Sequence, residues 1–188
     1  MVMKSRKTGD FLLLANGLGL VILLSLIAAD NFFRIDLTEE KRYSIKPQTQ
    51  ELLSDLTDDI YVEVYLEGEL NAEFRRLRNA IREVLDEFRI YSGNRVKISF
   101  VNPTTAMSQQ ARNEFIQDLA SKGVQPTRVV EQKDGQTSEK LIFPGAVIAY
   151  GGTEVGVTLL KGNKARTPAE EINQSIEGLE YEFANAIY

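Results

Sequence analysis

Four arginines recur in one expected helix at a spacing that places them on one face. They are Arg75, Arg78, Arg82 and Arg89. Guanidinium groups in such a row can bind a phosphate, an anionic lipid or an acidic partner. The alternative is a solvated face, partly neutralised by helical neighbours such as Asp86, four residues after Arg82. The basic stretch Lys161–Arg166 has the same two interpretations.

The amino-acid types that are missing exclude several kinds of chemistry. The chain has no Cys, hence no disulfide, thiolate nucleophile or CxxC pair. It has no His, which removes the commonest general base, the commonest transition-metal ligand and any Ser-His-Asp triad. It also contains neither a GxGxxG fingerprint nor a GxxxxGK[ST] loop. We therefore expect no enzyme, no catalytic residue, no metal and no cofactor.

The remaining short motifs have structural explanations. The glycines in GGTEVG (151–156) lack a following lysine and are typical of a hairpin turn. The acid pairs Asp58–Asp59 and Glu170–Glu171 are adjacent in sequence, and neighbours on a helix diverge by about 100°, which is unsuitable for sharing a proton or metal. The sequon at 173–175 lies inside an expected helix and is interpreted as incidental.

The longest apolar stretch of the chain runs over residues 11–29, FLLLANGLGLVILLSLIAA. It carries no charge, and as a helix it would be roughly 28 Å long, enough to cross a hydrocarbon core. Lys4, Arg6 and Lys7 precede it and Asp30 follows it. By the positive-inside rule, the N-terminus is expected in the cytoplasm and the residues after Asp30 outside, in the periplasm.

A cleaved signal peptide is the main alternative to this anchor. Signal cleavage favours small residues at positions −3 and −1. A cut after Ala29 leaves Ile27 at −3, and a cut after Ala28 leaves Leu26 there. We therefore favour an uncleaved single-pass anchor in a bacterial inner membrane.

Three positions in the apolar stretch are candidates for contact with another membrane helix. Ala15 and Gly19 form a small-xxx-small pair, and Asn16 lies beside them. Small residues allow close helix approach, and an asparagine in lipid favours a hydrogen-bonding partner. The alternative is ordinary glycine content, with Asn16 near the interface.

Charge is distributed unevenly along the chain. Residues 1–29 have a net charge of +2 and residues 30–188 a net charge of −7. An acidic domain is a poor candidate for binding nucleic acid.

The pattern after the anchor predicts an α/β fold. Alternating apolar strands and amphipathic helices predict a βαβαβ series, then a hairpin, then a helix. The expected strands are 61–66, 96–101, 127–130, 141–143, 146–150 and 155–160, and the main expected helices are 71–92, 107–121 and 167–187. A helical crossover favours parallel pairing of the first two strands, so we expect a mixed sheet flanked by helices, thioredoxin-like in outline.

This reading divides the chain into four parts. They are a cytoplasmic tail (1–10), a transmembrane anchor (11–29), a juxtamembrane strand and short helix (30–60) and an extracytoplasmic α/β domain (61–188). In the third part, residues 33–37 alternate like a short strand, and Ser44 is the expected cap of the short helix.

Several stretches taken together resemble a known family. They are DLTEEKRYSIKPQT (36–49), YVEVYLEGELNAEFRRLRNAIREVLDEF (61–88), FVNP (100–103), EKLIFPGAVIAYGGTEVGVTLLKGN (139–163) and NQSIEGLEYEFANAI (173–187). The combination resembles the GldG gliding-motility family of Bacteroidota and related auxiliary components of ABC transport systems.

The resemblance implies a membrane-anchored, non-enzymatic accessory subunit, substrate-binding-like, that works with an ABC permease and, through it, an ATPase. Other envelope proteins are possible further partners. Members of that family are longer and carry a second span, so we interpret this chain, whose last helix ends uncapped at Tyr188, as an N-terminal fragment. An extracytoplasmic ligand- or glycan-binding module independent of a transporter is the alternative.

Overall fold

The computed structural model describes residues 6–30, 45–103, 108–133, 136–161 and 167–188. The strand expected at 33–37 and the expected cap Ser44 lie outside these residues. The chain divides into two compact units, residues 1–42 and 43–188.

The described part of the first unit, residues 6–30, is the helix α1 (Arg6–Asp30), which includes the whole apolar stretch. Side chains are described for its residues 9–23, and all of them are exposed. In the parts of the chain that the structure describes, no helix meets the combined length and hydrophobicity needed to cross a membrane.

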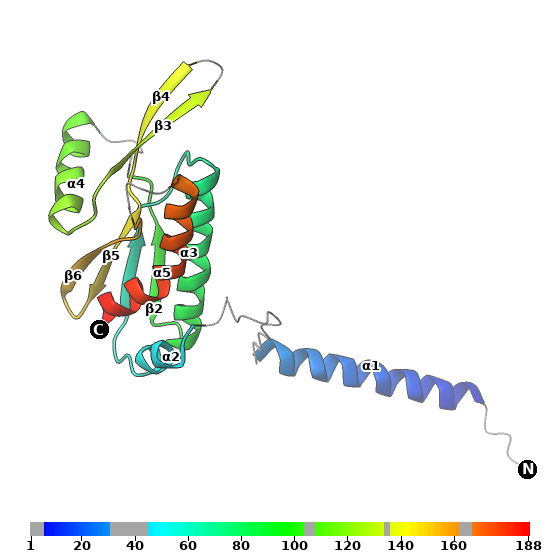
Figure 1. Cartoon of the computed structure of the whole chain (residues 1–188). Coiled ribbons are helices and arrows are strands. Elements are labelled where there is room, and N and C mark those ends of the chain that lie inside the picture. The colour runs from blue at the N-terminus through cyan, green and yellow to red at the C-terminus, as the bar shows by residue number, and fades with distance from the viewer. Residues whose placement is uncertain (1–5, 31–44, 104–107, 134–135, 162–166) are drawn as a thin grey trace, which may run out of the picture. The chain divides into compact units, whose positions relative to one another are not determined.

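The second unit is a mixed α/β domain (Figure 1). Its helices are α2 (Pro47–Ser54), α3 (Ala72–Tyr91), α4 (Gln109–Ser121) and α5 (Pro168–Ile187). Its strands are β1 (Ile60–Val64), β2 (Val96–Phe100), β3 (Thr127–Lys133), β4 (Gln136–Ile142), β5 (Gly145–Tyr150) and β6 (Thr153–Thr158). The expected mixed α/β class and its flanking helices are thus confirmed.

Four strands form the main sheet in the order β2-β1-β5-β6. β1 and β2 are parallel, as the helical crossover between them predicts, with Val62 opposite Ile98. β5 is antiparallel to β1, and β6 is antiparallel to β5. The β5–β6 turn has Gly151 and Gly152 at φ of 57° and 82°, the positive values that a two-residue type I′ turn requires.

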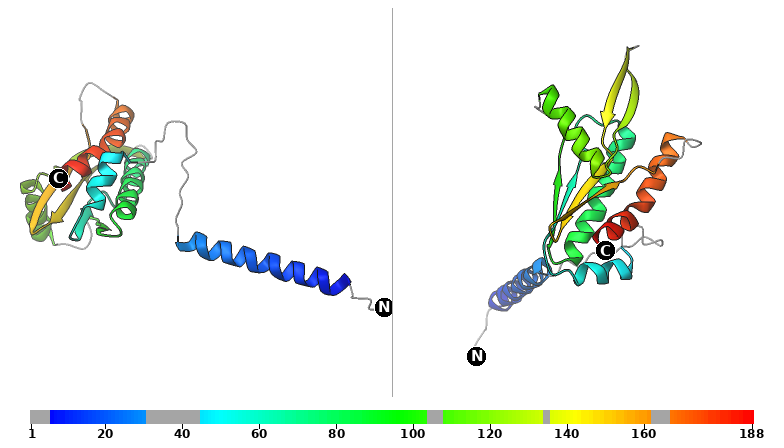
Figure 2. Two further views of the ribbon diagram at one scale, coloured as in Figure 1. Left: turned by 90° about the horizontal axis from the view of Figure 1, so that it is seen from below. Right: turned by 90° about the vertical axis from the view of Figure 1, so that its left-hand side faces the viewer.

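One face of this sheet is covered by α3 and α5 (Figures 1 and 2). β1 alternates buried and exposed residues, so Ile60, Val62 and Val64 all point into this layer. The two helices meet where Phe88 of α3 contacts Phe183 of α5 edge to face, with ring centroids 6.2 Å apart. α5 begins with the expected capping box, in which Thr167 and Glu170 bond each other's backbone N–H.

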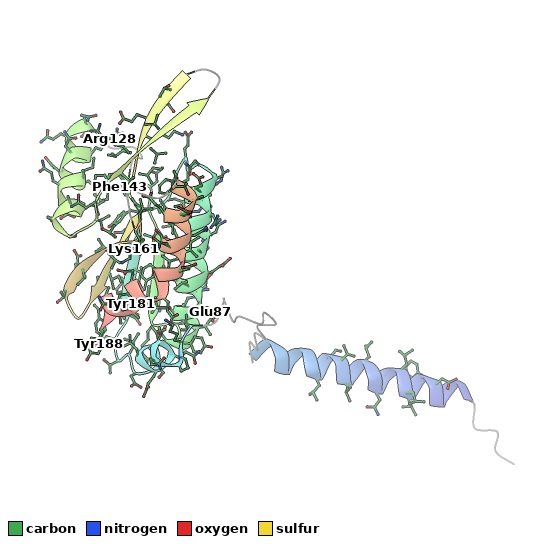
Figure 3. The ribbon with its side chains drawn as sticks, in the orientation of Figure 1. Glu87, Arg128, Phe143, Lys161, Tyr181 and Tyr188 are labelled. Carbon is green, nitrogen blue, oxygen red and sulfur yellow. The ribbon has the colours of Figure 1, made fainter. Side chains whose placement is uncertain are left out.

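The opposite face is covered in part by α4 and a smaller apolar cluster. The cluster is formed by Tyr65, Leu119, Val124, Phe143 and Val147. Phe143, labelled in Figure 3, lies between α4 and the sheet and is 1% exposed. Beyond the end of α4, the loop at 122–124 passes so close to β6 that residue 156 has room only for a glycine.

One detail of the sequence prediction is wrong. The third strand of the βαβαβ series, β3, does not join the main sheet but pairs with β4 over seven residue pairs in a separate hairpin. Both strands are longer than expected and mostly polar, TRVVEQK and QTSEKLI, so they lack the apolar residues of a sheet interior. The short helix α2 is capped by Lys46 without a side-chain hydrogen bond, and it packs in the second compact unit through Leu53.

Gly156 is crowded and Gly178 is not, so alanine substitutions at these two residues should change the stability of the domain in opposite directions. A Cβ on Gly156 would lie 2.7 Å from the carbonyl carbon of Lys122 and 3.2 Å from Val124, both poorly able to move. We expect Gly156→Ala to lower the free energy of unfolding by about 2 kcal/mol. In α5, a Cβ on Gly178 would lie 3.9 Å from Lys161, an ordinary contact distance. Because alanine loses less backbone entropy than glycine in a helix, Gly178→Ala should raise the free energy of unfolding by about 0.5–1 kcal/mol. Urea unfolding measures both, and equal effects would contradict the packing described.

Candidate functional site

The arginine row of α3 is the candidate contact for an anion or a partner on the α/β domain. α3 begins where Asn71 accepts a hydrogen bond from the backbone N–H of Phe74, at 2.9 Å. The apolar stripe of α3, from Phe74 to Phe88, is buried against the sheet. The register that buries this stripe places Arg82 beside β2, the last strand of the sheet.

Arg82 contacts the strand beside it. Its guanidinium carbon lies 4.6 Å from the centroid of the Phe100 ring, in a cation–π arrangement. Phe100 is the last residue of β2. The contact fixes the position of the charge at the carboxyl end of the strand, and the sequence spacing did not indicate it.

Arg78 is held by the loop that connects β1 to α3. Its Nη1 donates to Glu67 Oε1 at 2.9 Å, and both side chains are more than two-thirds buried. Its Nε is buried without a hydrogen-bond partner among the described residues. Gly68, at φ +108°, is the tightest point of this loop, because a Cβ there would lie 2.7 Å from the side-chain nitrogen of Asn102. Arg78 is therefore chiefly a structural cation that holds the loop.

The other two arginines of the row also have partners within the chain. Arg75 Nη1 donates to the Leu70 carbonyl at 3.3 Å. Arg89 pairs with Asp86 at 2.9 Å, so the helical neighbour neutralised by Asp86 is Arg89, three residues later, and not Arg82 as expected. The row thus separates into two arginines paired with carboxylates and two, Arg75 and Arg82, without a carboxylate partner in the described part of the chain.

Only the first residue of the second basic stretch is described. Lys161 pairs with Glu182 of α5, and its backbone N–H donates to Ser175 Oγ at 2.8 Å. The remaining residues of the predicted Lys161–Arg166 cluster, 162–166, lie outside the described residues. Lys161 itself therefore has a structural role in joining the β6–α5 connection to α5.

A second charged cluster, which the sequence reasoning missed, lies under α4. Lys122 bridges Asp118 at 2.9 Å and Glu154 at 2.7 Å, joining the end of α4 to β6. The hydrogen bonds to Glu154 and to Asp118 raise the pKa of Lys122. The spacing of Asp118 and Lys122 signals a helical pair, but only the fold brings Glu154 to it.

Tyr65 lies beside this cluster. Its hydroxyl donates to Glu63 at 2.6 Å, and its ring contacts Phe115 of α4 edge to face. Burial, followed by the hydrogen bond to Glu63, raises the pKa of Tyr65 well above its usual range. A tyrosine held neutral in this way joins α4 to β1 and is unsuited to act as a base near neutral pH.

The adjacent acid pairs are used structurally. Asp59 lies 3.8 Å from Lys97, and Glu170 caps α5. Among the residues that the structure describes, no three His, Cys, Asp or Glu side chains are grouped to hold a metal ion.

The candidate membrane-helix contacts Ala15, Asn16 and Gly19 are all exposed on α1. A Cβ added at Gly19 would meet nothing within 4 Å, and the same is true of Gly17. Ala15 and Gly19 are one turn apart on the same side of the helix. The structure brings them to one face, and a contact at that face remains a prediction.

The sequence places this α/β domain in a defined family. The family described as Domain of unknown function (DUF7088) matches residues 39–149, more than half of the chain. The chain belongs to this family. The matched segment runs from before α2 to the end of β5, and it includes the arginine row but not α1 or α5. No curated protein and no solved structure matches the chain.

The raised pKa values under α4 predict alkaline instability. Because folded Tyr65 and Lys122 hold their protons more tightly than in the unfolded chain, their stabilisation is complete below about pH 10 and is lost as the pH rises further. The free energy of unfolding should fall by up to about 1.4 kcal/mol per pH unit for Tyr65 alone. Tyr65→Phe should make this fall shallower, as measured by urea unfolding from about pH 9 to about pH 11.

Tyr61→Phe is the matched control, since Tyr61 lies on the same face of β1 but is 58% exposed. Equal slopes for the Tyr65→Phe and Tyr61→Phe proteins would show that burial of Tyr65 does not cause the alkaline loss.

Proposed function

We propose that this protein is a membrane-anchored, non-enzymatic accessory subunit of an ABC transport complex linked to gliding motility. In this proposal α1 anchors the chain in the bacterial inner membrane and contacts the permease through Ala15, Asn16 and Gly19. The α/β domain stands in the periplasm, and ATP hydrolysis belongs to a partner. The resemblance of five sequence blocks to the GldG family supports the assignment.

The observation that carries the proposal is the apolar surface of α1. Its large apolar residues each expose more than half of their surface. They are Phe11, Leu12, Leu13, Leu14, Leu18, Leu20, Val21, Ile22 and Leu23. A contiguous apolar surface of this extent requires an apolar environment, which a bilayer or other membrane helices supply. The sequence of residues 11–29 continues the same uncharged character for six residues beyond Leu23.

The charges around the stretch support the proposed orientation. Lys4, Arg6 and Lys7 precede it, and the residues from Asp30 onward carry a net charge of −7. Positive residues are retained on the cytoplasmic side during insertion. The acidic part of the chain is then the part that lies outside.

A thioredoxin-like outline for the α/β domain forms part of the proposal. The sheet order β2-β1-β5-β6, with β1 and β2 parallel and β5 and β6 antiparallel, supports it. Helices α3 and α5 on one face with α4 on the other agree with that outline. A thioredoxin-like fold does not by itself define an activity. The role that we propose for the domain is contact with other proteins.

The proposed non-enzymatic role agrees with the use of the polar side chains. Glu67, Asp118 and Glu154 are engaged in ion pairs that hold loops and helices. Tyr65 is kept neutral by burial. These groups stabilise the domain, and their contacts leave them badly placed for proton transfer to a ligand.

The proposed contact face on α1 predicts a position-specific effect of added bulk. Gly19→Leu should reduce recovery of the permease and ATPase by about tenfold in affinity purification of the full chain from its native membranes in mild detergent. The reason is that a leucine at residue 19 prevents close approach of a partner helix beside Ala15. Mass spectrometry of the recovered proteins gives the measurement.

Gly17→Leu is the matched control, because residue 17 lies about 200° around the helix from residue 19. It adds the same apolar bulk where a Cβ also has open space. Equal loss in both variants, or equal recovery with an unrelated anchor in place of residues 11–29, would exclude α1 as the specific contact. Failure to recover a permease with any version would refute the accessory-subunit proposal.

A further inference from the structure

The outer edge of β2 presents unpaired backbone groups. β2 is the end strand of the four-stranded sheet. The Ile60 N–H donates to the Arg95 carbonyl at 3.0 Å, and the Val101 N–H donates to the Val64 carbonyl at 2.8 Å. In a parallel pair, alternate residues of a strand point their N–H and C=O groups toward the neighbouring strand. These two bonds therefore show that the backbone groups of Lys97 and Ser99 point toward β1. The backbone of Ile98 and Phe100 must therefore point away from the sheet.

Neither Ile98 nor Phe100 has a backbone hydrogen-bond partner on this side among the described residues. The next outward donor, the N–H of Val96, is held by Ser92 Oγ at 3.2 Å. Two N–H and C=O pairs, two residues apart, thus remain open along the edge. This is the pattern to which an extended peptide adds as a further strand.

Three cations lie beside this edge, and the one carboxylate paired with any of them in the described part of the chain is Asp59. Arg82 stands over the Phe100 ring at one end of β2, and Arg95 immediately precedes the strand at the other. Neither guanidinium has a carboxylate partner in the described part of the chain. Between them, Lys97 is half exposed, and its Nζ lies 3.8 Å from Asp59 Oδ2, longer than a hydrogen-bonded ion pair. A strand added here would pass close to three cations.

We propose that the β2 edge binds an extended acidic segment of another polypeptide by strand addition. Backbone bonds to Ile98 and Phe100 would set its register, and its carboxylates would face Arg82 on one side and Lys97 on the other. A second copy of this chain is a poorer fit, because pairing β2 with β2 brings two basic margins together. The proposal does not depend on the transporter role, since it concerns the α/β domain alone.

The other edge of the sheet differs in charge. At β6, the cation Lys122 is already paired with Glu154 and Asp118. Thr158 donates its hydroxyl to the Gly123 carbonyl at 2.9 Å, which covers part of that margin. Of the two edges of the main sheet, the β2 edge is therefore the better complement to an acidic strand.

Amide hydrogen exchange of the full chain in detergent micelles tests the backbone geometry. The probe is a ten-residue peptide of alternating Val and Glu with blocked ends, at low salt. Without peptide, the amides of Ile98 and Phe100 should exchange fast and those of Lys97 and Ser99 slowly. Saturating peptide should slow Ile98 and Phe100 at least tenfold and leave Lys97 and Ser99 unchanged. Unchanged exchange at Ile98 and Phe100 would overturn the proposal.

Variants and control peptides test the charge. Arg82→Gln should weaken binding about threefold to fivefold, and Arg82→Gln with Lys97→Gln about tenfold. Arg76→Gln is the matched control, because Arg76 is also exposed on α3 but lies on its far side, and binding should not change. The corresponding Val and Lys peptide should not bind, nor should a Val and Glu peptide N-methylated at alternate residues.

Equal weakening by Arg76→Gln and Arg82→Gln would show unspecific attraction and refute the site. Slowed exchange at Ile98 and Phe100 on raising the protein concentration without peptide would identify a second copy as the occupant and refute the acidic-segment proposal. Loss of the ABC partners in the α1 variants, with peptide binding retained, would separate this site from the transporter role.

Discussion

The burial of β1 is the constraint on which the rest of the domain depends. This strand is paired on both sides, and its residues Ile60, Val62 and Val64 are each at most 1% exposed. Such a strand requires a helical layer over its apolar face, and α3 and α5 supply it. The register that buries the α3 stripe then places Arg82 beside Phe100 at the end of β2. The position of this charge is thus a consequence of how the core is closed.

The sequence predicted the parts of this fold that are encoded locally. The hydrophobic periodicity and the capping residues predicted α3 and α5. The side chains of the caps Asn71 and Thr167 accept hydrogen bonds from the first turns of these helices, as expected. The Gly151–Gly152 turn was evident because few other residues adopt positive φ. The position of β3 outside the main sheet was not evident, since polar strands pair through their backbones and carry little side-chain information about which sheet they join.

The candidate site shows the same division. The arginine row was visible as a helical spacing, but the arginine that pairs with Asp86 was predicted wrongly, because Asp86 has an arginine on either side, at i−4 and i+3. Tertiary contacts decide the role of each cation: Glu67 holds Arg78, and Phe100 positions Arg82. These contacts join residues 11 to 18 positions apart through the fold. Sequence spacing alone therefore identified the arginine row. The structure then distinguished the arginines that are paired with carboxylates from those that are not.

The pairing of β1 with β5 has a consequence for how the domain forms. Their partners are 82 to 88 positions apart in the sequence, as in Val64 with Ala146 and Tyr61 with Ala149. The β1–α3–β2 unit closes much shorter loops and can assemble early in synthesis, whereas β1 acquires its second neighbour only after β5 has emerged from the ribosome. Closing so long a loop costs chain entropy before any contact is gained. During that interval both margins of β1–β2 are open, and a nascent chain is then most exposed to mispairing.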